Sequence, residues 1–211
     1  KETVESAPVW LKKEVAKEEA EALAEKLKAD VPELLDRKAA GETTFARNAK
    51  GDFNSLQIVL LNEMGRFNKL LKRIKTSLND IMKGIKGLVV MSNELEAMAN
   101  AIAVNQVPGK WEKKAYPSMK PLSAWFDDLI MRIEMVENWI EAGIPVVFWI
   151  SGFYFPQAFL TGTRQNYARK MQYALDTISF DYPIVAQPWE SLKVKPENGA
   201  YIRGLYTEGA R

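Results

Sequence analysis

The stretch "FWISGFYFPQAFLTG", residues 148–162, decides how the second half of the chain folds. It crowds eight aromatic or large aliphatic residues around two glycines, one proline and one serine. The β-branched and aromatic run of residues 145–150 predicts a buried strand, and Pro156 favours the first turn of a helix that continues through Arg169. We therefore expect a tight turn between a strand and a helix, with the aromatic side chains in the core.

Ser151 lies in this turn, where an α/β-hydrolase would place its nucleophile. The elbow pattern G-x-S-x-G fails here, because Trp149 and Phe153 occupy the two glycine positions. The sequence also contains no histidine that could activate a serine. We therefore interpret Ser151 as a turn residue and not as a nucleophile.

The composition narrows the possible functions further. The 211 residues are 47% hydrophobic, which is enough for a substantial core, and the net charge of +2 argues against a dedicated nucleic-acid binder. Without cysteine or histidine, the protein cannot use disulfides, Cys-His or Ser-His-Asp catalysis, or metal sites built on those residues. We expect no cofactor and no metal. The N-terminus has no apolar signal segment, and the longest apolar run, residues 144–150, is too short to span a membrane, so we expect a soluble intracellular protein.

The strongest local signal is a helix start at residues 53–58. Asn54 can cap the helix, Gln57 can reach back to it, and Phe53 can pack against Ile58 as a hydrophobic staple. Apolar residues then recur at steps of four and three. This spacing predicts one amphipathic helix over residues 54–86, about 45–50 Å long, with Phe67 in its apolar stripe.

The other face of this helix is basic. It carries Arg66, Lys69, Lys72, Arg73, Lys75, Lys83 and Lys86. The simplest interpretation is a solvated surface or a contact with an acidic neighbour. An adaptor that binds an acidic partner or nucleic acid through this face stays open as an alternative, although no aromatic stacking platform lies among the charges.

Helices dominate the rest of the first two-thirds of the sequence. Residues 10–27 read as a charged helix, and residues 38–52 as a loop. A short helix begins with Asn93 as its cap and Glu96 three residues later. The turn at residues 107–111 marks a change in composition, and we place a domain boundary there. A strong apolar stripe then predicts a helix over residues 122–140, closed by Gly143.

The last part of the sequence is mixed. Residues 178–185 and 200–206 are strand-like, and Asn198-Gly199 is a turn signal. The sequence therefore predicts a mainly α fold with a smaller α+β C-terminal part. The chain also reads as a fragment of a larger protein, because "LYTEGAR" at its end resembles an interrupted strand.

Other chemical motifs are weak. Asp127 and Asp128 are adjacent, so a helix points them about 100° apart and does not form a carboxylate pair. The "MKGIKG" sequence at residues 82–87 lies at a helix end, where the helix dipole disfavours phosphate. Arg164 and Arg169 could clamp an anion, but we favour pairing with acids of this fold or of an adjoining domain. A carboxylate-based hydrolase would need two acids that converge in a cleft, and it remains a low-ranked alternative.

Four segments resemble, in order and spacing, the C-terminal end of dynein heavy chains. They are "GLVVMSNELE" (87–96), "VPGKWEKKAYPSMKPLSAWFDDL" (107–129), "FWISGFYFPQAFLTGTRQNYARK" (148–170) and "ENGAYIRGLYTEGAR" (197–211). The resemblance covers residues 53–211, and "QAFLTGTRQNYARK" resembles the axonemal, ciliary type. Four motifs in the right order are far more specific than any one of them.

The resemblance implies a structural role. Residues 1–105 would be the helical small subdomain of the sixth AAA+ module, and residues 106–211 the first part of a C-terminal domain of helices and a β-barrel. This piece would close and brace the motor ring without catalysis. The parent motor would hydrolyse ATP elsewhere and move on microtubules in the cytoskeleton of the ciliary axoneme. Its partners would be neighbouring AAA+ modules, other dynein subunits and the microtubule, with no membrane. The structural or interface candidates are Phe67, Trp111, Trp125, Trp139, Trp149, Arg164 and Arg169.

Overall fold

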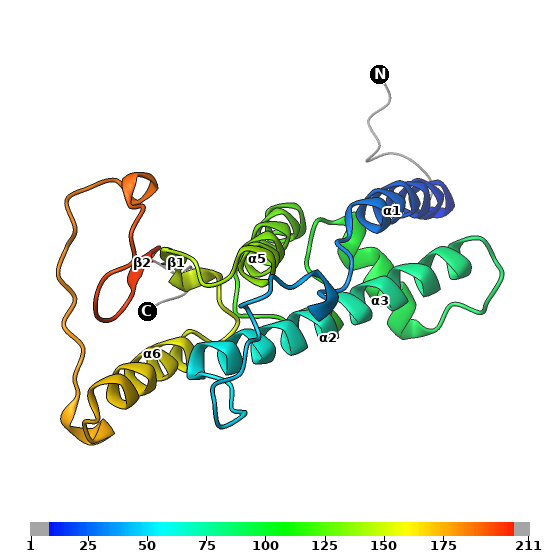
Figure 1. Cartoon of the computed structure of the whole chain (residues 1–211). Coiled ribbons are helices and arrows are strands. Elements are labelled where there is room, and N and C mark those ends of the chain that lie inside the picture. The colour runs from blue at the N-terminus through cyan, green and yellow to red at the C-terminus, as the bar shows by residue number, and fades with distance from the viewer. Residues whose placement is uncertain (1–8, 205–211) are drawn as a thin grey trace. The chain divides into compact units, whose positions relative to one another are not determined.

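The computed structural model describes the backbone of residues 9–204 and the side chains of residues 18–204. Six α-helices and two short strands make up its main elements (Figure 1). The helices are α1 (Val9–Asp30), α2 (Ser55–Ile85), α3 (Asn93–Ala103), α4 (Gly109–Glu112), α5 (Leu122–Ala142) and α6 (Pro156–Met171), and the strands are β1 (Val147–Trp149) and β2 (Tyr201–Arg203). The predicted mainly α fold with a small β part is confirmed for these residues. None of the described helices is both long and apolar enough to cross a membrane.

The protein forms two compact units. The first unit combines the residues up to Leu34 with Lys69–Ile130, and the second combines Leu35–Asn68 with the residues from Met131 onward. Helices α2 and α5 each contribute residues to both units. Residue 105, the expected end of the first domain, lies inside the first unit. The domain boundary at that residue stays a prediction.

Helix α2 begins with the capping box that its sequence predicts. The Gln57 backbone N–H donates to the Asn54 side-chain oxygen at 2.9 Å, and the Asn54 N–H donates to Gln57 Oε1 at 2.8 Å. The Gln57 amide also donates to the carbonyl oxygens of Thr44 and Ala46, at 3.0 and 2.8 Å, so the cap holds the preceding loop as well. Ile58, the expected staple partner of Phe53, is 46% exposed.

The cap of helix α3 differs from the prediction. The N-cap is Ser92, whose hydroxyl accepts a hydrogen bond from the Leu95 N–H at 3.3 Å, and Asn93 is the first residue of the helix. Serine and asparagine are about equally good at this position, so the sequence pattern alone could not choose between two neighbours.

The first unit has an aromatic core. Helix α1 packs against α3. The Trp111 ring stacks on Trp125 with centroids 6.1 Å apart, and Tyr116 stacks on Trp125 at the same distance. The indole N–H of Trp111 donates to the Ser77 hydroxyl at 2.7 Å, so this fully buried tryptophan has its polar atom satisfied.

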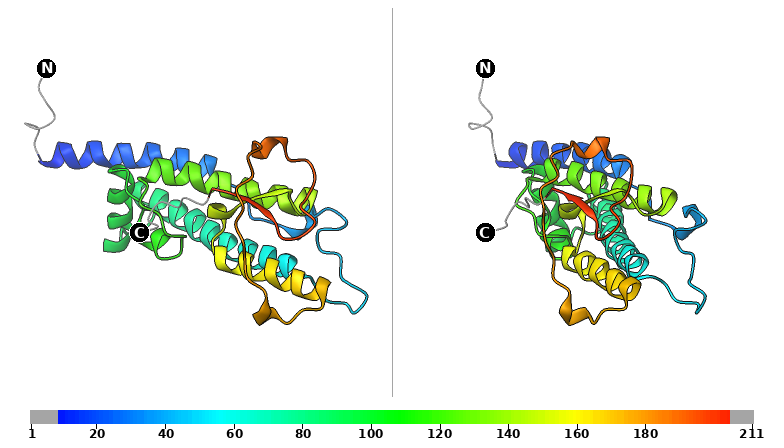
Figure 2. Two further views of the ribbon diagram at one scale, coloured as in Figure 1. Left: turned by 90° about the vertical axis from the view of Figure 1, so that its left-hand side faces the viewer. Right: turned by 60° about the vertical axis from the view of Figure 1, so that its left-hand side comes forward.

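In the second unit, α5 ends at Ala142, and Gly143 closes it as predicted, with a positive φ of 82° that turns the backbone towards β1. Strand β1 pairs in parallel with β2, whose arrow is drawn in red in Figure 2. In this pair Val147 lies opposite Tyr201 and Trp149 opposite Arg203. A single 3-10 turn, Ile150–Gly152, follows β1, and Pro156 opens α6. The predicted strand–turn–helix is therefore confirmed.

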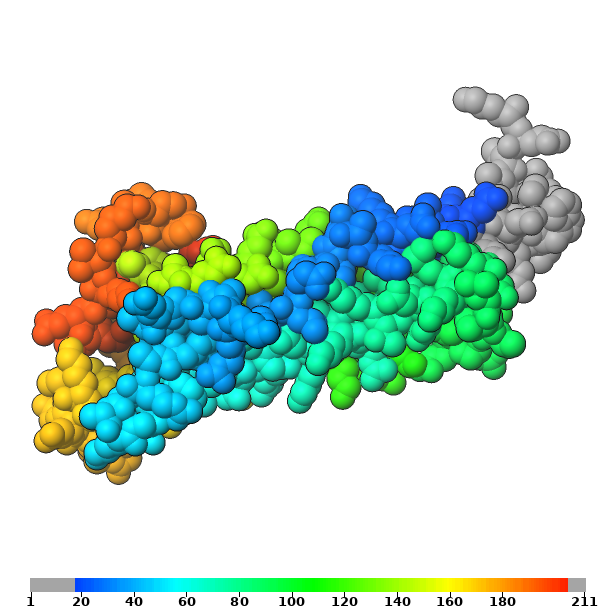
Figure 3. Space-filling model, turned by 45° about the vertical axis from the view of Figure 1, so that its right-hand side comes forward, coloured from blue at the N-terminus to red at the C-terminus, as the bar shows by residue number. Residues whose placement is uncertain are grey.

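The predicted strand at residues 178–185 is wrong. These residues form no regular structure, although the β2 part of the 200–206 prediction is confirmed for residues 201–203 and its last two residues lie outside the described residues. Among the described residues the sheet contains only β1 and β2, so this stretch has no ladder to join. Most of its apolar side chains are exposed, with Ile184 at 97%. Residues that follow it, coloured orange to red, lie at the surface in Figure 3.

Candidate functional site

The centre of the second unit is the junction, which we define as residues 147–156 from β1 to the start of α6. A carboxylate from α2 holds it. Glu63 accepts hydrogen bonds from two successive backbone N–H groups, with Oε2 2.5 Å from the Tyr154 nitrogen and Oε1 3.1 Å from the Phe155 nitrogen. The Glu63 residue is only 1% exposed. Both of its oxygens therefore tie the junction to the helix.

Burial sets the electrostatics of this carboxylate. It raises the pKa of Glu63 above the ordinary value of 4.5, and this effect outweighs the two backbone hydrogen bonds and the positive charges of Arg66 and Arg132, which act in the other direction. The Arg66 guanidinium lies 5.2 Å from the Phe155 ring centroid and 6.0 Å from that of Tyr154. Burial likewise raises the pKa of Tyr154 to about 12. The charges of Glu63 and Arg66, and the contacts of Arg66 with the rings of Tyr154 and Phe155, together hold the junction.

Aromatic rings fill the junction from its inner side. The centroid of the Phe148 ring lies 4.6 Å from that of Phe159 and 5.3 Å from that of Trp139. Phe153 stacks on Phe159 with their centroids 4.9 Å apart. All four rings are buried. Phe148, Phe153 and Phe159 therefore pack around the turn that holds the buried Ser151, whereas Trp149 and Tyr154 are half-buried and Phe155 is 45% exposed, unlike the expected core.

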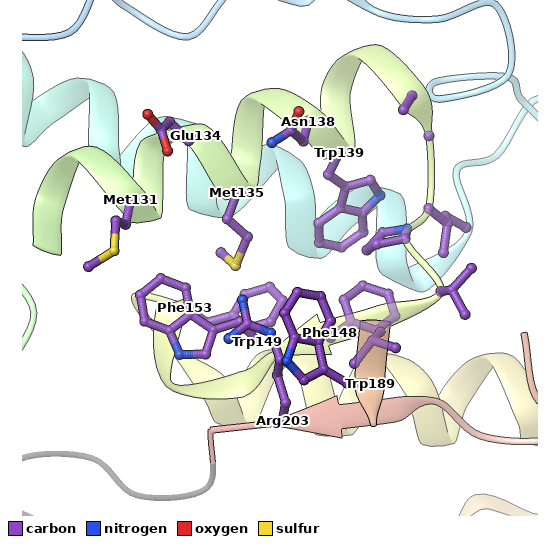
Figure 4. A pocket seen from close by; sticks show the side chains of 16 residues that line it. Met131, Glu134, Met135, Asn138, Trp139, Phe148, Trp149, Phe153, Trp189 and Arg203 are labelled. Carbon is purple, nitrogen blue, oxygen red and sulfur yellow. The ribbon is translucent and has the colours of Figure 1, made fainter. Parts of the chain in front are cut away.

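A groove of about 610 Å³ lies beside the junction (Figure 4). Met131, Glu134, Met135 and Asn138 of α5 line one side, and Trp149, Trp189 and Arg203 lie opposite them. The Arg203 guanidinium lies 4.3 Å from the Trp189 ring and 5.6 Å from the Trp149 ring, and Arg132 lies 5.3 Å from Trp149. Trp149 is thus a half-buried wall residue and not a core residue.

Helix α6 also contacts the start of α2. The Asn166 side-chain oxygen accepts from the Ser55 N–H at 3.0 Å, and Arg169 donates to the Ser55 hydroxyl at 3.0 Å. The absence of a side chain at Gly162 permits this close approach, because a Cβ there would lie 3.1 Å from Val59 Cγ2. The helix start at Ser55 is therefore held by α6 as well as by its own capping box.

Within the part of the protein that the structure describes, neither Arg164 nor Arg169 of α6 forms the expected ion pair with an acid. Arg169 binds the Ser55 hydroxyl, and the buried Nε of Arg164 has no hydrogen-bond partner there. A contact of either arginine with an acid of an adjoining domain stays a prediction.

The candidate interface residues fall into two groups. Trp111 and Trp125 lie together in the first unit, whereas Phe67, Trp139 and Trp149 lie around the junction of the second. The fully buried Phe67 ring packs edge-on against Tyr154 at 5.1 Å. Their role as interface residues stays a prediction.

Sequence reasoning missed Glu63, the residue that holds the junction. A signal was present, because Glu63 lies three residues after Leu60 and four before Phe67, on the apolar face of α2. A carboxylate on such a face must find a partner, here the backbone of the junction.

In the described part of the protein, no cluster of three acidic residues could hold a metal ion.

Two lysines of the basic face, Lys75 in α2 and Lys86 directly after it, pair with acids of the first unit, in and just after α1. Lys75 lies 2.8 Å from Glu33, which lowers the pKa of Glu33, and Lys86 lies 3.6 Å from Glu25. Both pairs are at the surface, where such contacts contribute little to stability. The interpretation of this face as a solvated surface or a contact with an acidic neighbour stays a prediction.

Comparison with known proteins adds a family. A model of the family described as the C-terminal domain of the dynein heavy chain matches residues 2–211. Dynein axonemal heavy chain 1 of Mus musculus is 53% identical over 157 residues, which cover 74% of this chain and 4% of the relative. Dynein axonemal heavy chain 6 of Homo sapiens is 41% identical over 201 residues, covering 86% of this chain and 5% of the relative. The protein thus spans a small fraction of the length of these relatives.

Proposed function

Because the chain belongs to the family of C-terminal domains of dynein heavy chains, we propose that it is a structural part of an axonemal dynein heavy chain that closes and braces the AAA+ motor ring. In this proposal the piece carries out no catalysis itself. The parent heavy chain hydrolyses ATP elsewhere and moves along microtubules in the ciliary axoneme.

The Glu63 clamp, which is this carboxylate with its two backbone donors, is the observation that supports a bracing role most strongly. It joins a 31-residue helix to a junction 91 residues away through two backbone hydrogen bonds. A bond to backbone fixes the path of the polypeptide whatever side chains the turn carries. A load on the junction would therefore reach α2 through a fixed contact and not through a flexible loop.

We also propose that the two halves of the sequence belong to different domains of the heavy chain. Residues 1–105 serve as the small helical subdomain of the sixth AAA+ module, and residues 106–211 as the first part of the C-terminal domain. Neighbouring AAA+ modules of the same heavy chain are the immediate partners. The tryptophans Trp111, Trp125, Trp139 and Trp149, with Phe67, hold the two parts in shape, and Arg164 and Arg169 contact an adjoining domain.

Titration of the purified protein with MgATP in a calorimeter tests the claim that it performs no nucleotide chemistry. We expect no saturable heat of binding, whereas a whole heavy chain gives one under the same conditions. Saturable binding to the 211-residue protein that is weakened by Arg164→Ala or Arg169→Ala would contradict the proposal, because side chains of this piece would then grip the phosphates.

A further inference from the structure

The loop between α2 and α3 (Figure 1) presents three consecutive apolar side chains to solvent. Leu88 is 73% exposed, Val89 44% and Val90 93%. Single exposed apolar residues are normal on a protein surface, but a run of three is unfavourable unless it serves a contact. This loop therefore needs a functional explanation.

The backbone of the loop is fixed where it leaves α2. The Gly87 N–H donates to the Gly84 carbonyl at 3.0 Å and the Leu88 N–H to the Lys83 carbonyl at 2.9 Å, which together form a Schellman cap. Gly87 supplies the required positive φ of 73°. In this cap the residue at the position of Leu88 usually packs back onto its helix. Here its side chain is turned outward instead.

The other end of the loop is held as well. The Met91 side chain lies against Gly84, in the space that a Cβ on that glycine would need. Ser92 then caps α3 through the Leu95 N–H. Because both ends are anchored, little conformational entropy remains to be lost when the three side chains are covered. The loop is thus preorganised for a contact.

Charges near the loop indicate the chemistry of the partner. Lys83 lies in the last turn of α2 and Lys86 directly follows the helix, where both complement its carbonyl end. Lys86 pairs with Glu25 at 3.6 Å, and on the α3 side Glu94 pairs with Lys110 at 2.5 Å. Lys83 is in none of the ion pairs within the described residues. A matching surface would therefore carry carboxylates on the α2 side of an apolar pocket.

The size of the patch decides where that surface lies. Three side chains offer on the order of a few hundred Å², whereas independent proteins need roughly 1,200 Å² or more for a stable complex. A patch this small is effective only when its partner is tethered at high local concentration. Resting on the proposed function, we propose that the loop docks into an apolar, carboxylate-bordered pocket on another part of the same heavy chain.

A photo-cross-linker at Val90 in the whole heavy chain tests this inference, with the exposed α2 residue Lys72 as the matched control site. We expect links from Val90 to an apolar segment flanked by Asp or Glu, outside residues 1–211, at a yield several-fold above that from Lys72. Yields equal to those from Lys72, or links only to a separate polypeptide, would overturn it.

A second variant separates this inference from the proposed function. Val90→Ser leaves the melting of the 211-residue protein unchanged, because the Val90 side chain is exposed to solvent there. The same substitution lowers the protection of the cross-linked segment from proteolysis in the whole heavy chain. An unchanged proteolysis pattern refutes the docking loop, while the bracing role of the junction is tested independently through Glu63.

Discussion

The Glu63 carboxylate accepts a hydrogen bond of 2.5 Å from the backbone nitrogen of Tyr154, a residue 91 positions later in the sequence. Its second oxygen accepts from the next backbone nitrogen at 3.1 Å. One side chain thus satisfies two donors of a buried turn. Its loss should weaken the turn and the attachment of the turn to α2 together.

Glu63→Gln should destabilise the protein by about 1–3 kcal/mol, because the amide keeps one acceptor oxygen and turns an NH2 group towards the second backbone donor. Urea melts of the two proteins measure the difference. Glu42→Gln, at an exposed position of the same unit, is the control and should change stability little. Equal effects of the two substitutions would contradict the clamp.

The stability of the clamp should depend on pH. Because burial raises the pKa of Glu63 above 4.5, the folded state binds more protons than the unfolded state between that value and the raised pKa. The neutral Glu63 carboxyl therefore makes its full contribution to the free energy of unfolding below about pH 4.5. That contribution is lost as the pH rises through the raised pKa.

Urea melts across this pH range should show the stability difference between wild type and Glu63→Gln shrinking as the pH rises. Subtracting the variant removes the contribution of Glu137, whose pKa is also raised by burial and by its neighbours Glu141 and Glu134. A difference that grows with pH would show that the two backbone hydrogen bonds outweigh burial.

The two kinds of tryptophan should differ in their cost when truncated. Trp111→Ala should cost about 3–5 kcal/mol, because the ring is fully buried and its N–H is bonded to Ser77. Trp149→Ala should cost less, because that ring lines an open groove. Thermal melts of both variants make the comparison, and a larger loss for Trp149 would show that the groove is closed in solution.

Two glycines should respond to alanine in opposite directions. At Gly152 a Cβ would lie 2.5 Å from Trp149 Cε3 and 2.9 Å from Met135 Sδ, so Gly152→Ala should cost about 1–3 kcal/mol through overpacking. At Gly65, within α2, a Cβ would meet no atom within 4 Å. Gly65→Ala should therefore stabilise by about 0.5–1 kcal/mol. Chemical denaturation of both variants tests the pair, and a neutral Gly152→Ala would be inconsistent with this packing.

The sequence predicts those features whose cause is local. The capping box of Asn54 and Gln57, the helix end at Gly143 and the start of α6 at Pro156 each depend on residues within a few positions. The failed strand at residues 178–185 shows the limit, because β propensity produces a strand only where a partner strand pairs with it.

The candidate site was less predictable for the same reason. The partner of Glu63 lies 91 residues away, so its position on an apolar helix face showed that a contact was needed but not which one. Trp149 belongs to a predicted strand, yet its exposure depends on Arg203 of β2 and on Trp189, which only the fold brings near it.

The bracing role itself is tested most directly by Glu63→Gln in a whole axonemal dynein heavy chain, with ATP hydrolysis and microtubule gliding measured on the same preparation. A brace transmits force without chemistry. The variant should therefore hydrolyse ATP at close to the wild-type rate while its gliding velocity falls, and Glu42→Gln should change neither. Gliding at the wild-type velocity would contradict the account, as would a loss of hydrolysis without any loss of stability.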